Sequence, residues 1–80
     1  MNKRIKIVLG GLIDDGYEEL VVFFYIDDIY FGLISQENGV NNLVIELFET
    51  TKPRKIEYDL FLEALIEAKK YLLNEWFFIR

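Results

Sequence analysis

The alternation of hydrophobic and polar residues predicts four β-strands in the first part of the chain. The runs are rich in β-branched and aromatic side chains, which fit the pleated surface of a sheet. The second and third runs are separated only by Asp27 and Asp28, and two turn-forming residues between such runs indicate a tight β-hairpin. We expect the strands at about residues 3–9, 17–26, 29–35 and 43–48.

The turn positions predict which side chains share a face of this sheet. A two-residue turn after the second strand places Phe24 opposite Phe31, and a turn at Asp15-Gly16 aligns the first strand with the second. A bulge of one residue at either hairpin would move part of a strand to the other face. With this register the predicted core face comprises Ile5, Ile7, Leu9, Leu20, Val22, Phe24, Ile26, Ile29, Phe31 and Leu33, continued by Leu43, Ile45 and Leu47.

From about Ile56 the spacing of hydrophobic residues changes to that of an amphipathic helix, which we expect at about residues 58–75. Asp59 can cap its N-terminus. The apolar stripe covers nearly half of the helix, which is wider than contact with one sheet requires. It comprises Phe61, Leu62, Leu65, Ile66, Ala68, Leu72, Leu73 and Trp76.

These elements predict a single α+β domain over residues 1-80. Its order is ββββα, a four-stranded antiparallel β-meander followed by one long C-terminal helix packed on one sheet face. The chain has 80 residues and is 52% hydrophobic, so it can form a core without disulfides, and it has no cysteine.

The second face of the predicted sheet is also apolar, and one helix cannot cover both faces. Large exposed apolar patches usually mark interaction sites, and aromatic residues and arginine are enriched at protein interfaces. We therefore expect a protein-binding surface here, unless residues 76–79 fold back over it. The candidate interface residues are Val21, Phe23, Tyr25, Tyr30 and Ile34, edged by Arg4 and Lys6.

Charge argues against nucleic acid as a partner. The net charge is −5, from nine basic and fourteen acidic residues, whereas sequence-independent binding requires neutralisation of phosphates. The topology gathers several acids at one end of the sheet, as solvated turns or as an acidic rim that mimics the charge of nucleic acid. The rim candidates are Asp14, Asp15, Glu18, Glu19 and Glu37.

Enzymatic, metal and membrane functions find no support in the residue pattern. The chain has no histidine and no cysteine, which removes the commonest metal ligands and the commonest general base. The Asp14-Asp15 and Asp27-Asp28 pairs fall at opposite ends of the meander, so we expect no metal site, no cofactor and no catalytic residue. The longest apolar run, 20–26, is far shorter than the roughly 20 residues that span a bilayer. A cytoplasmic protein is therefore expected.

The sequence thus predicts a small acidic, non-enzymatic protein-binding module. Stand-alone proteins of this size and composition often inhibit or neutralise a protein partner by steric occlusion, as immunity proteins and phage anti-defence inhibitors do. Abundant Ile, Phe, Tyr, Asn and Lys is common in AT-rich genomes, and this favours a bacterial or phage source. Two alternatives remain: a structural homodimer whose aromatic sheet face is the subunit interface, and an acidic mimic of nucleic acid.

Overall fold

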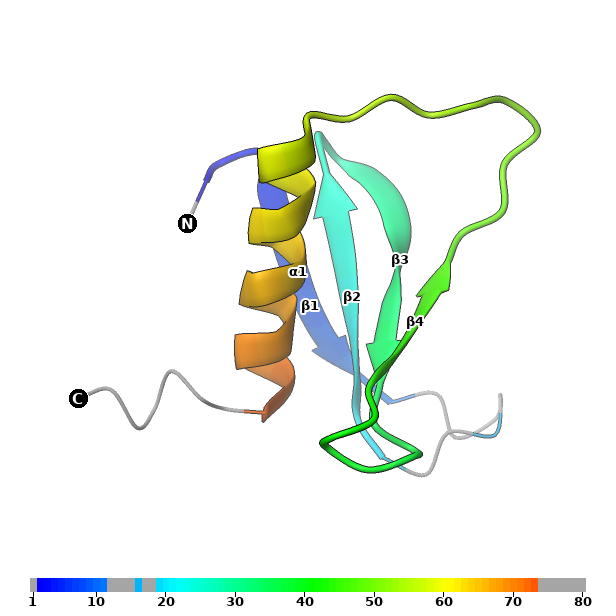
Figure 1. The fold of residues 1–80 in the computed structure, drawn as a ribbon, viewed down its shortest axis with the longest axis vertical. Helices are drawn as coiled ribbons and strands as arrows, with labels where there is room; N and C mark the ends of the chain where they lie inside the picture. The colour runs from blue at the N-terminus through cyan, green and yellow to red at the C-terminus, as the bar shows by residue number, and fades with distance from the viewer. Residues whose placement is uncertain (1, 12–15, 17–18, 74–80) are drawn as a thin grey trace.

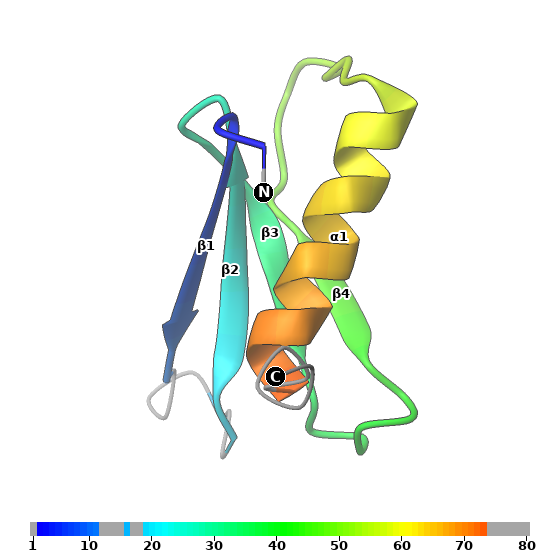
Figure 2. The ribbon, with the colours of Figure 1, turned by 90° about the vertical axis from the view of Figure 1, so that its left-hand side faces the viewer.

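The computed structural model describes residues 2–11, 16 and 19–73, and it contains four strands followed by one helix (Figure 1). The sheet is antiparallel, with spatial order β1-β2-β3-β4, and α1 lies across one face to give two layers (Figure 2). The predicted ββββα arrangement is confirmed. The elements are β1 (Ile5–Gly10), β2 (Val21–Ile26), β3 (Ile29–Ser35), β4 (Val44–Leu47) and α1 (Tyr58–Leu73).

The β2–β3 hairpin turns through the two residues that the sequence indicated. Asp27 and Asp28 have φ values of 53° and 64°, so both lie in the left-handed region that a type I′ turn requires. Aspartate adopts this region more readily than most residues with a side chain. The predicted two-residue turn is therefore confirmed.

The β1–β2 pairing also follows the predicted register, with Ile5 opposite Ile26 and Ile7 opposite Phe24. The described pairing ends with Gly10 opposite Val21. The second strand was expected from residue 17 and begins at Val21. Asp15, part of the proposed first turn, lies outside the described residues.

A β-bulge changes the register in the middle of the β2–β3 pair. Tyr25 lies opposite Tyr30 as predicted, but Phe24 then pairs with Gly32 rather than with Phe31. The extra residue shifts the rest of β3 by one position, because side chains alternate between faces. The predicted faces of Leu33 and Ile34 are consequently wrong and must be exchanged.

After the bulge, Ile34 pairs with Val22 on the helix side and belongs to the main core, whereas Leu33 pairs with Phe23 on the second face. The core is closed by four helix residues at i, i+4 spacing. Two of them are alanines, which let α1 approach the sheet closely. The buried core residues are Ile5, Val22, Phe24, Ile26, Phe31, Ile34, Leu60, Ala64, Ala68 and Leu72.

The buried line of α1 is therefore rotated from the predicted centre of the stripe. Phe61 and Leu65 are only partly buried and lie on its flank. Asp59 lies in the first turn, where a carboxylate interacts favourably with the helix dipole, rather than before the helix. Residues 74 and 75 of the predicted helix, and Trp76, lie outside the described residues. Five residues of the predicted core face are instead well exposed: Leu9, Leu20, Ile29, Ile45 and Leu47.

The helix does not cover the whole of its sheet face. It packs on β1, β2 and β3, and no Cα atom of α1 lies within 8 Å of one in β4. All four residues of β4 are exposed, and residues 48–57 then arch from the end of β4 to the start of α1 (Figure 1). Edge strand β4 therefore presents its helix-side residues to solvent.

Candidate interaction surfaces

The aromatic residues predicted for the second sheet face do come together. Tyr30 is at the centre of this group. The centroid of its ring lies 6.1 Å from that of Phe23 and 5.5 Å from that of Tyr25. Phe48, from the segment after β4, lies 5.4 Å from the same ring, and Lys6 Nζ lies 5.5 Å from the Tyr25 centroid. Such pairs favour tilted and edge-to-face contacts like these. Phe23, Tyr25 and Tyr30 are half-buried, so much of this predicted surface is covered by its own rings.

The central tyrosine has a perturbed acidity. Burial raises the pKa of Tyr30, and the negative charges of Glu46 and of Tyr25 when ionised raise it further. Burial penalises the phenolate relative to the neutral phenol. Tyr30 therefore contributes packing and a neutral hydroxyl at physiological pH.

The other three interface candidates are not available for contact on this face. Val21 is 0% exposed, so it cannot contact a partner in this conformation. Ile34 belongs to the core under α1, as a consequence of the bulge. Arg4 lies at the end of the sheet and is engaged by two carboxylates. Of the seven candidates, the structure thus brings four together: Lys6, Phe23, Tyr25 and Tyr30.

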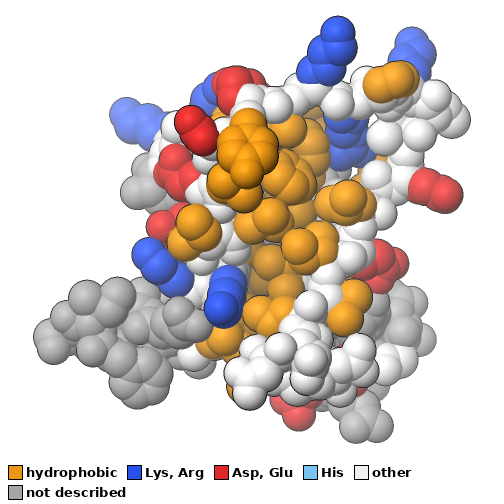
Figure 3. Space-filling view, viewed as in Figure 1, with side chains coloured by type: hydrophobic (Ala, Val, Ile, Leu, Met, Phe, Trp, Pro, Cys, Tyr) orange, Lys and Arg blue, Asp and Glu red, His pale blue; other side chains and the backbone are white. Residues whose placement is uncertain are grey.

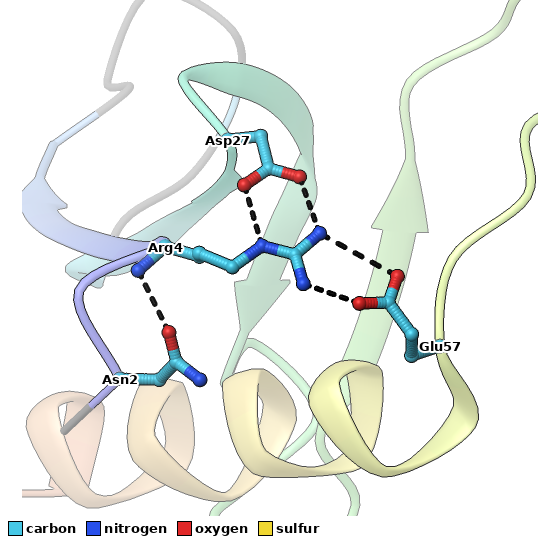
Figure 4. Close-up of polar contacts among 4 residues, drawn as sticks. All are labelled: Asn2, Arg4, Asp27 and Glu57. Atoms are coloured by element: carbon cyan, nitrogen blue, oxygen red, sulfur yellow. Dashed lines mark hydrogen bonds and ion pairs between the residues drawn. The ribbon is translucent and has the colours of Figure 1, made fainter.

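Arg4 ties three elements together at this end of the sheet (Figure 4). Its Nε and one terminal nitrogen donate to the two oxygens of Asp27 at 2.7 and 2.6 Å, and its guanidinium also donates to Glu57. These contacts raise the pKa of Arg4 and lower those of Asp27 and Glu57. The backbone N–H of Arg4 donates to the side-chain oxygen of Asn2. We interpret Arg4 as a structural residue that joins β1, the hairpin turn and the start of α1.

Only part of the acidic rim can be placed. The backbone N–H of Glu19 donates to the Glu37 carboxylate at 2.8 Å, so these two rim candidates lie together. Asp14, Asp15 and Glu18 lie outside the described residues.

Another exposed apolar surface lies on the helix side of the sheet. On β4, Ile45 is 46% and Leu47 59% exposed, because α1 does not reach them. On α1, Leu62 and Ile66 are exposed along the outer flank, with Ile66 at 54%. Figure 3 shows the hydrophobic band between α1 and β4. We call these four residues and the half-buried Phe61 and Leu65 between them the helix-side surface.

Sequence reasoning missed this surface because it assumed that one helix would cover the whole face. The one available signal was the apolar stripe of the helix, which is wider than a single sheet contact needs. Its excess width corresponds to Leu62 and Ile66 in the structure.

One end of the helix-side surface opens into a pocket of about 540 Å³ beneath the segment that follows β4. Arg54 lies in this pocket, with its guanidinium carbon 4.6 Å from the centroid of Phe31 and 5.5 Å from that of Phe48. Arg54 also donates a hydrogen bond of 3.0 Å to the backbone carbonyl of Tyr30 in β3. Tyr30 lies past the point where β4 stops pairing with β3, because the last residue of β4 pairs with Gly32. The other lining residues are Leu47, Thr50, Thr51, Lys52, Pro53, Ile56 and Phe61.

Within the described ranges, acidic side chains do not gather into a group of three or more that could hold a metal ion. The same part of the chain holds no helix with the length and apolarity needed to cross a membrane. Comparisons with protein-family models, curated proteins and solved structures gave no match to this chain. Function is therefore inferred from the residues and their geometry.

Proposed function

We propose that this protein is a small, cytoplasmic, non-enzymatic binding module that occludes a functional surface of a protein partner. The helix-side surface is the contact region that the geometry favours, rather than the aromatic sheet face expected from the sequence. The observation that carries the proposal is the exposure of Ile45, Leu62 and Ile66, together with the hydrophobic band between α1 and β4 (Figure 3).

The free-energy cost of exposing apolar surface to water supports the choice of the helix-side surface. Apolar area exposed to water is worth roughly 25 cal/mol per Å² when a partner covers it. A contiguous apolar patch rimmed by polar residues is typical of interaction sites on soluble proteins. The aromatic sheet face offers less, since its rings already cover one another. An inhibitor or immunity type of action follows if the covered partner surface is itself functional.

The proposal is tested by photo-crosslinking in the native host. A benzophenone amino acid at position 66 lies on the helix-side surface, and the same residue at Lys3 is the control, exposed near the opposite edge of the sheet. We expect one discrete adduct with a foreign protein from position 66 and none from position 3. Mass spectrometry would identify the adduct.

A matched pair of variants then tests whether the apolar side chains cause the contact. Leu62→Gln with Ile66→Gln removes apolar surface but keeps good helix-forming residues, whereas Lys69→Gln changes an exposed cation on the same helix. The double variant should lose the adduct from a crosslinker placed at position 45, and Lys69→Gln should keep it. Equal adducts from positions 66 and 3, or none from position 66, would contradict the proposal.

A further inference from the structure

We propose that the end of β4 and the segment after it form a self-complementary surface through which two copies of this chain associate. The surface consists of Glu46, Leu47, Phe48, Glu49 and Lys52, and the exposed Lys55 follows three residues later in the same segment. This surface shares Leu47 with the helix-side surface, whereas the contact residues proposed for the foreign partner on α1 lie outside it, so the two proposals can be tested separately.

The centre of the surface is apolar and unusually exposed for an edge strand. Leu47 and Phe48 are 59% and 54% exposed at the end of β4. Sheet edges are normally protected by lysine, proline, a bulge or a covering element, since an open edge can pair with another chain. Among the described residues, β4 has no strand on its outer side, and Glu46 is the only charge within it.

Charges of opposite sign lie on the two sides of this apolar centre. On one side is the 540 Å³ pocket, lined by Lys52 and Arg54, and no acidic side chain lines it. On the other side is a hollow of about 420 Å³, lined by Glu46 and Glu49. Leu47 and Phe48 line both, so they separate the basic hollow from the acidic one. The other residue of the acidic hollow is Tyr30.

The basic residues of this segment are not neutralised within the described part of the chain. Arg4 pairs with two carboxylates and Lys70 with one, whereas Lys52, Arg54 and Lys55 form no ion pair there. In a chain with net charge −5, three cations within four residues are available to an acidic surface. Arg54 is already stacked and hydrogen-bonded, which leaves the two lysines as the mobile charges.

A two-fold axis near Leu47 and Phe48 would place the basic side of each copy against the acidic side of the other. An interface of this type uses the same patch on both copies, so residue i meets residue j and j meets i. The lysines of each copy would then face Glu46 and Glu49 of the other copy, around a shared apolar centre. A foreign acidic partner would contact only the basic half. Its binding would therefore depend on the lysines and not on Glu46 and Glu49, and variants of the two halves can distinguish these cases.

Charge reversal with complementation tests the proposal. Variant A carries Glu46→Lys and Glu49→Lys, and variant B carries Lys52→Glu and Lys55→Glu. Each variant alone places like charges opposite one another, whereas a mixture of A and B restores opposite charges at both halves of the interface. Sedimentation equilibrium and native mass spectrometry would measure the oligomer. Lys69→Glu, an exposed charge reversal on α1, is the control.

The wild type and the control should both form a dimer. Its Kd should fall as the salt concentration is lowered, because salt screens the attraction between opposite charges. Each double variant should raise the dimer Kd by about tenfold or more, because like charges oppose association, and the mixture should return it to near the wild-type value. Recovery in the mixture also shows that both variants fold. The proposal is overturned by a wild-type monomer at about 500 µM protein, or by a mixture that stays as weak as its components.

Two further outcomes separate the rival occupants. A monomeric wild type whose crosslink from position 66 persists would reject self-association and keep the foreign partner. If variant B weakens association and variant A does not, the basic half binds some other acidic group and the two-fold arrangement is wrong.

Discussion

The guanidinium of Arg4 holds the carboxylate of Asp27 through two parallel hydrogen bonds of 2.7 and 2.6 Å, although 23 residues separate them in the chain. Bidentate contacts of this kind combine charge with fixed geometry. They join the start of β1 to a turn whose two residues both have positive φ. The same guanidinium reaches Glu57, just before α1.

This cluster should make stability depend on acid pH. The pKa values of Asp27 and Glu57 are lowered by Arg4, so their contribution is present above the ordinary carboxyl pKa and is lost as pH falls through the lowered values. Arg4→Gln should therefore lower Tm at neutral pH, and the difference from wild type should shrink in acid. Calorimetry across this range checks it, with Lys3→Gln as the control. A pH-independent difference would contradict the interpretation.

Gly32→Ala should destabilise the β3–β4 pair. A Cβ at this position would meet the backbone carbonyl oxygen of Glu46 and lie 3.1 Å from Cα of Leu47, so β4 would have to move. We expect a loss of about 1–3 kcal/mol in the free energy of unfolding, the usual range for overpacking. Urea unfolding measures it. Gly11→Ala is the matched control, since nothing lies within 4 Å of its Cβ.

Arg54→Met should loosen the segment between β4 and α1. The change keeps a long apolar side chain but removes the stacked cation and the hydrogen bond to the Tyr30 carbonyl. We expect a loss of about 1–2 kcal/mol, the sum of a modest cation–π contact and one hydrogen bond. Urea unfolding and amide exchange of residues 48–57 would show it. Lys3→Met, at an exposed lysine outside this segment, should change neither.

Phe24→Ala should come close to unfolding the chain. Its ring is fully buried and contacts Phe61 of α1 with centroids 6.0 Å apart. Truncation of a buried phenylalanine costs about 3–5 kcal/mol, against a total of about 4–12 kcal/mol expected for a domain of this length. Circular dichroism with urea titration measures it. Val40→Ala, an exposed loop residue, should lie within about 0.5 kcal/mol of wild type.

Much of the architecture could be predicted from local pattern alone. Alternation predicted the order of the four strands, and the change of period predicted the helix. The Asp27-Asp28 pair predicted the hairpin, since two residues between strands leave few turn types. The β1–β2 register then followed from parity, as Ile7 opposite Phe24 shows.

What the sequence by itself determined is therefore the strands, their order, the hairpin and the helix, each encoded by neighbours in the chain. Tertiary structure decided the rest. The bulge moves Ile34 to the core, and next to it the backbone of β4 approaches Gly32, a contact between segments that no local pattern encodes. Close packing of Ala64 and Ala68 against the sheet set the rotation of α1. With α1 in this position β4 stays uncovered, and no local pattern encodes where one helix lies on a sheet. Arg4 and Arg54 were likewise placed by contacts with residues distant in the sequence.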